Sequence, residues 1–267
     1  MVRSPLRWAG SKTQLLPEIM KYFPKSINRY YEPMLGGGAV FFANNFQDAF
    51  LADQNEELIN YYQILKEYNT EFIDQIISLK PTRDRYYELR NTIPDDRMER
   101  AIRFAYLNRL SWNGLYRVNR NGDFNVPFGG RTPKSLWSRD HLIKCSKKLQ
   151  NVELACHDFL SLNISFKNND LVFIDPPYPK GVSEGVGFNR YNANPFTIES
   201  HIKLSKKILE LANKDVKVLL TLGDNQQILE LYSDHFIKTK VYTKSFISCN
   251  GNSRGSTIEF ILRNYKN

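Results

Sequence analysis

The chain has 267 residues, is 42% hydrophobic and carries a net charge of +9. This length can bury one sizeable α/β core with a smaller attached unit, and the composition excludes a disordered or fibrous protein. No apolar run approaches the roughly 20 residues that span a bilayer and no apolar secretory signal opens the chain, so we expect a cytoplasmic protein with no membrane partner. Cys145, Cys156 and Cys249 form no metal-ligand pattern, which favours a reduced protein without a metal site.

The positive charge is concentrated in the middle of the chain. Between residues 83 and 148 there are 15 Lys or Arg residues against 7 Asp or Glu. Clustered cations gain free energy by displacing counterions from phosphates, so a polyanion such as a nucleic acid is the natural partner. Taken alone, the same excess is equally compatible with a solvated basic face.

The first 55 residues have the pattern of half a nucleotide-binding βαβ unit. A strand at residues 30–33 leads into Gly36, Gly37 and Gly38 and then into an apolar helix, and the next apolar segment ends at Asp53. An acidic residue at this distance from a glycine turn commonly binds a ribose hydroxyl. The glycines lack the Gly-x-Gly-x-x-Gly spacing typical of NAD sites. S-adenosylmethionine, which has a ribose but no phosphate, suits this turn.

The amino terminus adds a second pattern, in which Trp8, Gly10 and Lys12 precede a predicted helix. These three residue types can enclose a carboxylate and an adenine ring. As a lone pattern they are more often the ordered start of a first helix.

The middle segment, residues 56–148, is predicted to be mainly helical. Apolar residues recur at helical spacing between residues 58 and 77, and a further helix is expected at 98–110. Asn121 and Gly122 then stand between two β-prone runs, which is a strong signal for a β-hairpin.

Strands and helices alternate again in the last segment. Strands are expected at residues 152–156, 171–174, 216–222 and 256–262, and a helix at 198–212 with Thr197 as its N-cap. Alternation at both ends predicts an α/β fold made of residues 1–55 and 149–267, with residues 56–148 inserted as a second domain.

The strongest local signal is Asp175-Pro176-Pro177-Tyr178, which follows an apolar strand. Ligands bind at the carboxyl ends of strands in open α/β sheets, and two prolines stiffen the backbone and remove two amide donors. The Asp175 carboxylate and the Pro176 carbonyl are suited to accept both hydrogens of an adenine N6 amino group, which would free its lone pair. Tyr178 offers a stacking surface for a flipped base. A rigid turn with a surface tyrosine is the alternative reading of these four residues alone.

Taken together and in this order, the motifs resemble the Dam-type group (D12 class, alpha group) of site-specific DNA adenine-N6 methyltransferases. The resemblance covers nearly the whole chain, and the matching segments are residues 7–12, 31–42, 113–117, 124–129, 175–178 and 247–251. It implies a Rossmann-like S-adenosylmethionine-dependent methyltransferase sheet with an inserted DNA-recognition domain. It also implies base flipping and methylation of adenine N6 in double-stranded DNA, at GATC or a site containing GAT, with S-adenosylhomocysteine as the product.

The resemblance assigns the cofactor site and the catalytic centre to particular residues. The cofactor residues would be Trp8, Lys12, Pro33, Gly36, Gly37, Gly38, Asp53, Asp158, Phe159 and Asp175. The glycine turn would lie under the methionine portion of the cofactor, and Asp158 with Phe159 would flank its adenine. Asp158 could equally cap the end of a strand. The catalytic residues would be Asp175, Pro176, Pro177 and Tyr178.

DNA contacts are expected from the amino terminus and the hairpin, and the candidates are Arg7, Asn113, Leu115, Arg117, Asn119 and Pro127. A two-stranded ribbon fits the major groove, where Arg117 can read guanine O6 and N7 while Leu115 and Pro127 can touch a thymine methyl group. Asn113 could meet the base left unpaired by flipping. A surface hairpin with ordinary turn residues is the alternative.

Two positions depart from the family's amino-terminal Lys-Trp-Ala-Gly-Gly-Lys. Ser11 replaces a glycine, a small change that should not prevent binding, and Arg7 replaces a lysine, which keeps the charge and adds a bidentate fork.

Other functions stay open at the level of sequence. One alternative is a DNA-binding regulator that has lost catalysis, against which Trp8, Lys12, Asp175 and Tyr178 argue. Another is a methyltransferase acting on RNA or on a protein amide, against which a groove-sized basic hairpin argues. The sequence does not decide between an orphan enzyme, a viral one and one with a cognate restriction endonuclease as genetic partner. We expect a monomer or weak dimer.

Overall fold

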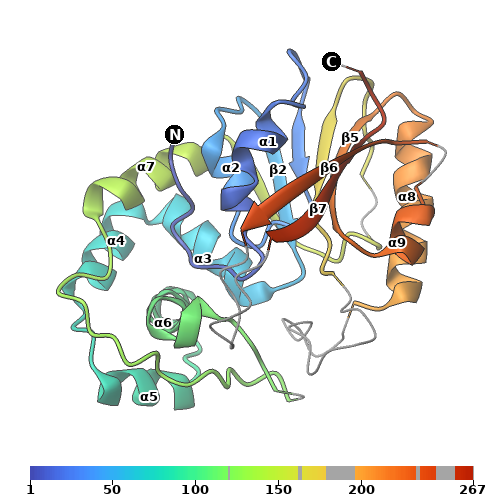
Figure 1. Cartoon of the computed structure of the whole chain (residues 1–267). Coiled ribbons are helices and arrows are strands. Elements are labelled where there is room, and N and C mark those ends of the chain that lie inside the picture. The colour runs from blue at the N-terminus through green and yellow to red at the C-terminus, as the bar shows by residue number, and fades with distance from the viewer. Residues whose placement is uncertain (120, 162–163, 179–195, 233–234, 245–255, 267) are drawn as a thin grey trace.

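Seven strands form one sheet among the residues that the computed structural model describes, which are 1–119, 121–161, 164–178, 196–232, 235–244 and 256–266. They are β1 (Tyr30–Glu32), β2 (Ala49–Asp53), β3 (Val152–Cys156), β4 (Leu171–Ile174), β5 (Lys217–Gly223), β6 (Ile237–Lys244) and β7 (Ser256–Arg263). The sheet order is β3-β2-β1-β4-β5-β7-β6 (Figure 1), with β7 antiparallel to both β5 and β6 and the other pairs parallel. The order reverses between β1 and β4, which is where ligands bind in open α/β sheets.

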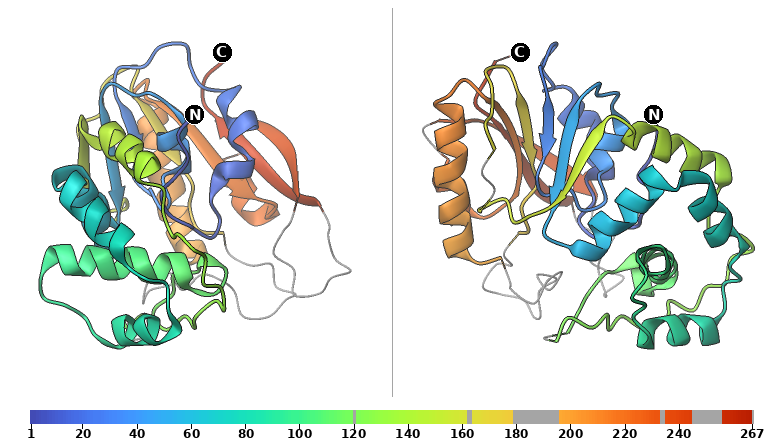
Figure 2. Two further views of the ribbon diagram at one scale, coloured as in Figure 1. Left: turned by 90° about the vertical axis from the view of Figure 1, so that its left-hand side faces the viewer. Right: turned by 180° about the vertical axis from the view of Figure 1, so that it is seen from behind.

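Helices cover both faces of the sheet and extend beyond one side of it (Figure 2). In chain order they are η1 (Lys12–Gln14), α1 (Leu16–Met20), α2 (Ala39–Ala43), α3 (Glu56–Glu67), α4 (Asn69–Ser78), α5 (Arg83–Asn91), α6 (Arg97–Leu110), η2 (Trp112–Gly114), α7 (Arg139–Leu149), α8 (Ile198–Ala212) and α9 (Gln226–Glu230). The helix α8 lies on one face with α9, α1 and α2 lie on the other, and α4, α5, α6 and α7 gather to one side (Figures 1 and 2).

Alternate residues of the central strands point into two separate apolar cores. Tyr31 and Val172 belong to the core beneath α8 and α9, whereas Tyr30 and Phe173 belong to the core shared with the other helices. Because both faces of these strands are buried, the strands are continuous apolar runs in the sequence.

Most of the predicted elements are confirmed. The strands expected at 152–156 and 171–174 and the helix at 198–212 have the bounds of β3, β4 and α8. The Thr197 side chain caps α8 by accepting a hydrogen bond from the Ser200 amide. The helical run at 58–77 is two helices, α3 and α4, which meet at Tyr68. The elements α5, α7, α9 and β6 have no counterpart among the predicted ones.

The predicted hairpin is present as an irregular ribbon rather than a regular ladder. Isolated bridges join Val118 to Phe124 and Ser111 to Phe128. The Asn119 amide donates to the Asp123 carbonyl at 2.8 Å and closes a loop that contains Gly122 at φ +88°. Pro127, which has no amide hydrogen, lies between the bridges and interrupts regular pairing.

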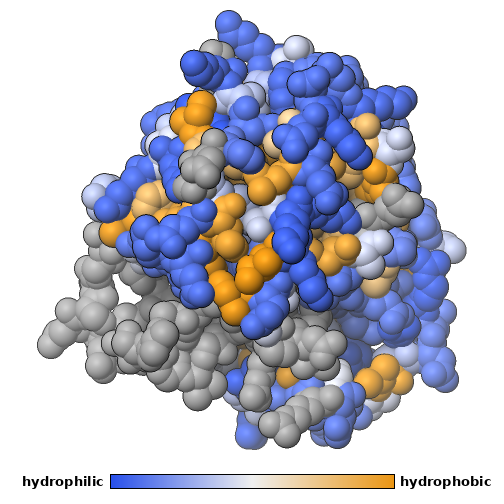
Figure 3. Space-filling model, turned by 90° about the vertical axis from the view of Figure 1, so that its right-hand side faces the viewer, coloured by the Kyte–Doolittle hydropathy of each residue, from blue (hydrophilic) through white to orange (hydrophobic). Residues whose placement is uncertain are grey.

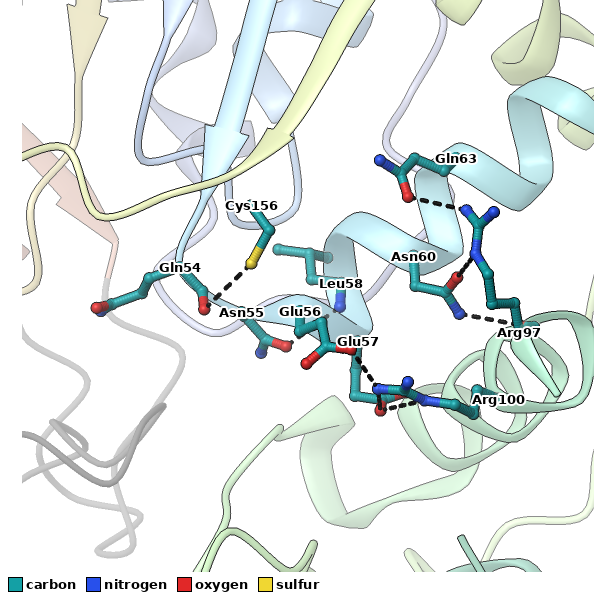
Figure 4. Close-up of polar contacts among 10 residues, drawn as sticks. All are labelled: Gln54, Asn55, Glu56, Glu57, Leu58, Asn60, Gln63, Arg97, Arg100 and Cys156. Carbon is teal, nitrogen blue, oxygen red and sulfur yellow. Dashed lines mark hydrogen bonds and ion pairs between the residues drawn. The ribbon is translucent and has the colours of Figure 1, made fainter. Parts of the chain in front are cut away.

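Ionic and amide contacts attach α6 to α3 (Figure 4). Arg100 lies 2.9 Å from Glu56 and 2.5 Å from Glu57, and Arg97 Nε donates to Asn60 Oδ1 at 3.2 Å. The helix α3 begins shortly after β2, so these contacts join the segment that follows β2 to the first turn of α6. One apolar core also runs through the sheet and the helices of residues 56–148, and the domain boundary predicted there stays a prediction.

The face of the molecule that carries α8 is mainly hydrophilic, with apolar side chains exposed in small groups between charged ones (Figure 3). In the part of the chain that the structure describes, no helix combines the length and apolar character needed to cross a bilayer.

Candidate active site

A cavity of about 300 Å³ lies at the carboxyl ends of β1, β2, β3 and β4. Its lining includes all ten residues predicted to hold a cofactor, namely Trp8, Lys12, Pro33, Gly36, Gly37, Gly38, Asp53, Asp158, Phe159 and Asp175, together with Pro176, Pro177 and Tyr178. The fold therefore brings five separate parts of the sequence to one hollow of the size that small-molecule sites have.

Trp8 packs directly on the glycine turn. A Cβ atom on Gly36 would lie 2.7 Å from Trp8 Nε1, and one on Gly37 would lie 2.8 Å from Trp8 Cβ. Gly36 and Gly38 have φ angles of +47° and +62°, which side chains rarely adopt. The turn needs glycine both for its backbone conformation and for the close approach of the indole ring.

Asp53 braces this turn from the end of β2. Its Oδ2 accepts a hydrogen bond from the Gly36 amide at 2.9 Å, and its Oδ1 accepts one from the Asn55 amide at 3.0 Å. Burial raises the pKa of Asp53, and the two amide donors oppose that rise. A carboxylate has about four lone-pair positions, so the bracing leaves capacity for a ligand hydroxyl.

Glu32, at the end of β1, is a buried carboxyl group that the motif analysis does not single out. Its Oε2 accepts hydrogen bonds from the Tyr30 hydroxyl at 2.8 Å and from the Phe41 amide at 3.1 Å. Burial raises the pKa of Glu32 to about 8, against the opposing effect of the Tyr30 hydroxyl. Its place beside Pro33 in the glycine motif is the signal that points to it.

Asp175 is held at the end of β4 by three donors that converge on one of its oxygens. Thr221 Oγ1 on β5 lies 2.7 Å from Oδ1, Lys12 Nζ lies 2.9 Å away, and the Tyr178 hydroxyl lies 3.3 Å away. Burial raises the pKa of Asp175, and the neighbouring Lys12 opposes that rise.

Tyr178 packs against the end of β5 and its hydroxyl points to the same cluster. A Cβ on Gly223 would lie 3.0 Å from Tyr178 Cδ2, and the Tyr178 hydroxyl lies 3.2 Å from Glu259 Oε2 on β7. Behind the prolines, His201 Nε2 on α8 donates to the Pro177 carbonyl at 3.1 Å. Thr221, His201 and Glu259 stand in no motif, so only the fold reveals them.

Asp158 and Phe159 follow β3. The Phe159 ring is buried in the core beneath α8, with Lys207 Nζ 4.9 Å from its centre. The Asp158 side chain is exposed and its Oδ1 accepts a hydrogen bond from the Leu160 amide at 3.0 Å. Asp158 thus caps the loop after β3 and also lines the cavity.

The predicted DNA-contact residues lie outside the cavity, along the ribbon after α6. Asn113, Arg117 and Pro127 are exposed, and Leu115 is half-buried. The Asn119 side chain holds the ribbon loop, because its oxygen accepts hydrogen bonds from the amides of residues 121 and 123.

Trp112, in η2, is a large exposed residue that the motif analysis does not select. It is 55% exposed, and its amide donates to the Pro127 carbonyl at 3.0 Å. An aromatic residue inside a basic segment is the signal that points to it.

The amino terminus joins the ribbon to the cavity. Asn108 on α6 accepts a hydrogen bond from the Arg7 amide at 3.0 Å and donates one to the Arg7 carbonyl at 2.6 Å. A Cβ on Gly114 would lie 2.5 Å from Arg7 Cβ. The next residue, Trp8, stacks on Tyr116 with the ring centres 5.8 Å apart. Residues of α6 and of the ribbon after it therefore form part of the support for the cavity wall.

Residues 247–251, the last segment of the resemblance, lie outside the described residues, as does Cys249. Cys145 and Cys156 are free thiols.

The sheet order with its antiparallel β7, and the cavity at the carboxyl ends of the parallel strands, are those of a Rossmann-like methyltransferase. Residues 8–246 match the family described as D12 class N6 adenine-specific DNA methyltransferase. The chain belongs to this family, and it is an adenine-specific DNA methyltransferase. The family and the fold imply S-adenosylmethionine as the methyl donor.

Several relatives match over nearly their whole length. A type II methyltransferase, M.MjaIII of Methanocaldococcus jannaschii, is 32% identical over 99% of both chains. The type II methyltransferase M1.LlaDCHI of Lactococcus lactis subsp. cremoris is 33% identical over 98% of this chain and 95% of its own. The DNA adenine methylase of Escherichia coli K12 is 32% identical over 99% and 95%. A solved delta-N METTL16 MTase domain is 9% identical over 94% of this chain and 84% of its own, with a TM-score of 0.35.

Proposed function

We propose that this enzyme methylates adenine N6 within GATC, or within a longer site containing GAT, in duplex DNA. The target adenine would be flipped out of the helix, and S-adenosylhomocysteine would be the second product. The main support for this proposal is the way in which Asp175 is held at the cavity. Three donors hold its Oδ1, beside a cavity of about 300 Å³.

S-adenosylmethionine supplies an electrophilic methyl group on a sulfonium. The chain's part is to present the adenine amino group as a nucleophile. Asp175 and the Pro176 carbonyl would accept hydrogen bonds from its two N–H groups, which weakens delocalisation of the nitrogen lone pair into the ring. As the N–C bond forms, the S–C bond of the methyl donor breaks and leaves neutral S-adenosylhomocysteine, and the methylated nitrogen then loses one proton through Asp175 to solvent. His201 fixes the Pro-Pro segment through its hydrogen bond to the Pro177 carbonyl at 3.1 Å. Acceptors held in place before the reaction stabilise charge at lower cost than ones that must reorient.

The cavity residues fit this cofactor. A side chain at Gly36 or Gly37 would fill the space that Trp8 occupies, so bare backbone lines this part of the wall. Asp53 would accept from a ribose hydroxyl, and the Asp175 carboxylate suits a cationic cofactor, while Glu32, whose pKa burial raises to about 8, supplies a neutral hydrogen-bonding group in the wall. The chain has no Gly-x-Gly-x-x-Gly run at this turn that would favour a dinucleotide.

Recognition of the DNA sequence would come from the ribbon after α6. Arg117 is exposed with its Nε oriented by Asn125 Oδ1 at 2.8 Å, which suits bidentate contact with a guanine edge. Trp112 is 55% exposed next to Asn113, and an aromatic ring there could fill the gap that a flipped base leaves. The GATC-type target rests on the resemblance of residues 113–117 and 124–129 to the family's recognition hairpin.

Product analysis tests the reaction. Purified enzyme is incubated with methyl-labelled S-adenosylmethionine and DNA from a strain without adenine methylation, and the nucleosides are separated after digestion. We expect label in N6-methyladenine alone. Label in cytosine, or in no base, would contradict the proposal, and absence of cofactor binding by calorimetry would favour a regulator that has lost catalysis.

Sequence specificity needs a separate experiment. Duplexes carrying GATC, and matched duplexes with one base pair changed, are compared for kcat/KM, with single-stranded DNA and RNA as competitors. We expect each change within GAT to lower kcat/KM by about 10-fold or more, as loss of one bidentate base contact does. Equal rates on all duplexes would refute the site.

We also propose that this chain has a cognate restriction endonuclease as its genetic partner. Two relatives are named type II methyltransferases, which supports a cognate restriction endonuclease as the partner of this chain. Such a nuclease should cut the unmethylated site and leave the methylated site intact. A neighbouring nuclease that cuts a different sequence would contradict this partnership.

A further inference from the structure

Glu259, on β7, lies in the same cluster as Asp175 although it belongs to no motif. The antiparallel register pairs it with Gly223 on β5 and with Val241 on β6, so its backbone is fixed by strands on both sides. The side chain is 16% exposed, and its Oε1 accepts a hydrogen bond from Thr243 Oγ1 at 3.3 Å. Glu259 is thus held firmly next to the catalytic carboxylate.

Glu259 and Asp175 share the same two donors. Lys12 Nζ lies 2.9 Å from Asp175 Oδ1 and 3.6 Å from Glu259 Oε2, and only 7% of the Lys12 side chain is exposed. The Tyr178 hydroxyl lies 3.3 Å from Asp175 Oδ1 and 3.2 Å from Glu259 Oε2. One ammonium group and one phenol therefore stand between two carboxylates.

The net charge of Lys12, Asp175 and Glu259 determines how strongly Asp175 can stabilise positive charge on the adenine amino group. Lys12 with Asp175 alone would form a neutral pair, and a paired carboxylate is a weak acceptor for a further positive group. With Glu259 present, the two carboxylates and one ammonium keep a net charge of −1. Methyl transfer moves positive charge from sulfur to the adenine nitrogen, so a negative cluster beside that nitrogen stabilises the transition state more than a neutral one.

We propose that Glu259 is a positioning residue for the methyl transfer, resting on the function proposed above. It shares Lys12 and Tyr178 with Asp175, and so keeps the negative charge of Asp175 available to the adenine amino group. It acts through these neighbours and needs no contact with either substrate. Its charge matters to the chemical step and not to the affinity for cofactor or DNA.

The first test compares Glu259→Gln with Glu259→Asp. Gln keeps the shape and the acceptor oxygen but loses the charge, and Asp keeps the charge on a shorter side chain. Single-turnover rates are measured with saturating cofactor and a GATC duplex, and cofactor and DNA affinities by titration. We expect Glu259→Gln to lower the rate by about 10-fold or more, with affinities within about twofold, and Glu259→Asp to retain more of the rate.

A double-mutant cycle with Lys12→Gln isolates the shared ammonium. Glu259 is proposed to act by balancing Lys12, so Glu259→Gln should have little further effect once Lys12 is Gln. The matched control is Glu153→Gln. Glu153 lies on β3, away from the cavity, and its Oε2 is 2.8 Å from Arg29 Nη2. This control should keep the wild-type rate, and the unfolding midpoint of each variant checks its fold.

Two results would overturn the inference. One is a wild-type single-turnover rate for Glu259→Gln. The other is a rate for Glu259→Gln above that of Glu259→Asp, which would show that shape matters and charge does not. These outcomes differ from failure of the proposed function, because in that case the wild-type enzyme itself would form no N6-methyladenine.

Discussion

Replacing Gly36 by alanine should weaken cofactor binding as well as the fold. Gly36 has φ +47°, and a left-handed conformation costs a residue with a Cβ atom about 1–2 kcal/mol. The new Cβ would also lie 2.7 Å from Trp8 Nε1, so the indole must move to reach the 3.4 Å of an ordinary contact. Trp8 lines the cavity and stacks on Tyr116, so this movement reshapes the cofactor site.

The assay is calorimetric titration with S-adenosylmethionine, together with urea unfolding. We expect the Gly36→Ala dissociation constant to rise by about 10-fold or more, which corresponds to about 1.4 kcal/mol. The control is Gly122→Ala, where φ is +88° and no atom lies within 4 Å of the added Cβ. It should lose about 1–2 kcal/mol of unfolding free energy with no change in cofactor affinity. The reasoning would be refuted if Gly36→Ala bound the cofactor with an affinity within twofold of wild type. It would also be refuted if Gly122→Ala lost as much cofactor affinity as Gly36→Ala.

Three further predictions concern single side chains. Asp175→Asn should lower the methyl-transfer rate by about 100-fold or more, because it replaces the charged acceptor, and an active variant in the nucleoside assay would contradict that role. Trp112→Ala should leave the unfolding free energy within about 0.5 kcal/mol and lower kcat/KM on duplex DNA, and the loss should shrink when the target adenine is mismatched; equal loss on both substrates would argue against gap filling. The raised pKa of Glu32, about 8, implies that wild-type stability falls between about pH 5 and pH 8, because the unfolded chain loses the Glu32 proton in this range while the buried carboxyl keeps it. In Glu32→Gln, the free energy of unfolding should depend less on pH over this range. An unchanged dependence on pH would contradict the raised pKa of Glu32.

The parts of the site that lie on the parallel strands could be predicted from sequence. Asp53 and Asp175 each follow a short apolar run, and the fold class fixes that such strands end at one edge. The glycine turn carries a conformational requirement that only Gly36 and its neighbours satisfy. Local pattern was sufficient wherever a strand end or a turn determines the position of a side chain.

The rest depends on pairings between distant segments. Glu259 reaches Asp175 only because β7 runs antiparallel beside β5, and no local pattern states that register. Asn108 lies in the last turn of α6 and has the pattern of an ordinary polar helix residue, yet it binds the backbone of Arg7. The helix α5 is rich in charge and buries only Tyr86, so it has little apolar periodicity to reveal it. The helix α7 does bury Leu142, Cys145 and Leu149 at helical spacing, which is a signal that the sequence analysis missed.

The attachment of the amino terminus to α6 limits how the ribbon, which we propose to recognise DNA, can be exchanged between relatives. Asn108 and Gly114 fix Arg7, and Tyr116 supports Trp8, which in turn covers the glycine turn. In a chimera that takes residues 97–130 from another enzyme, the residues that contact Arg7 and Trp8 would come from that enzyme and would not match them. Engineering a new recognition sequence by segment exchange would therefore call for both pieces to be moved together, and the first dozen residues are best left free of fusions that displace them.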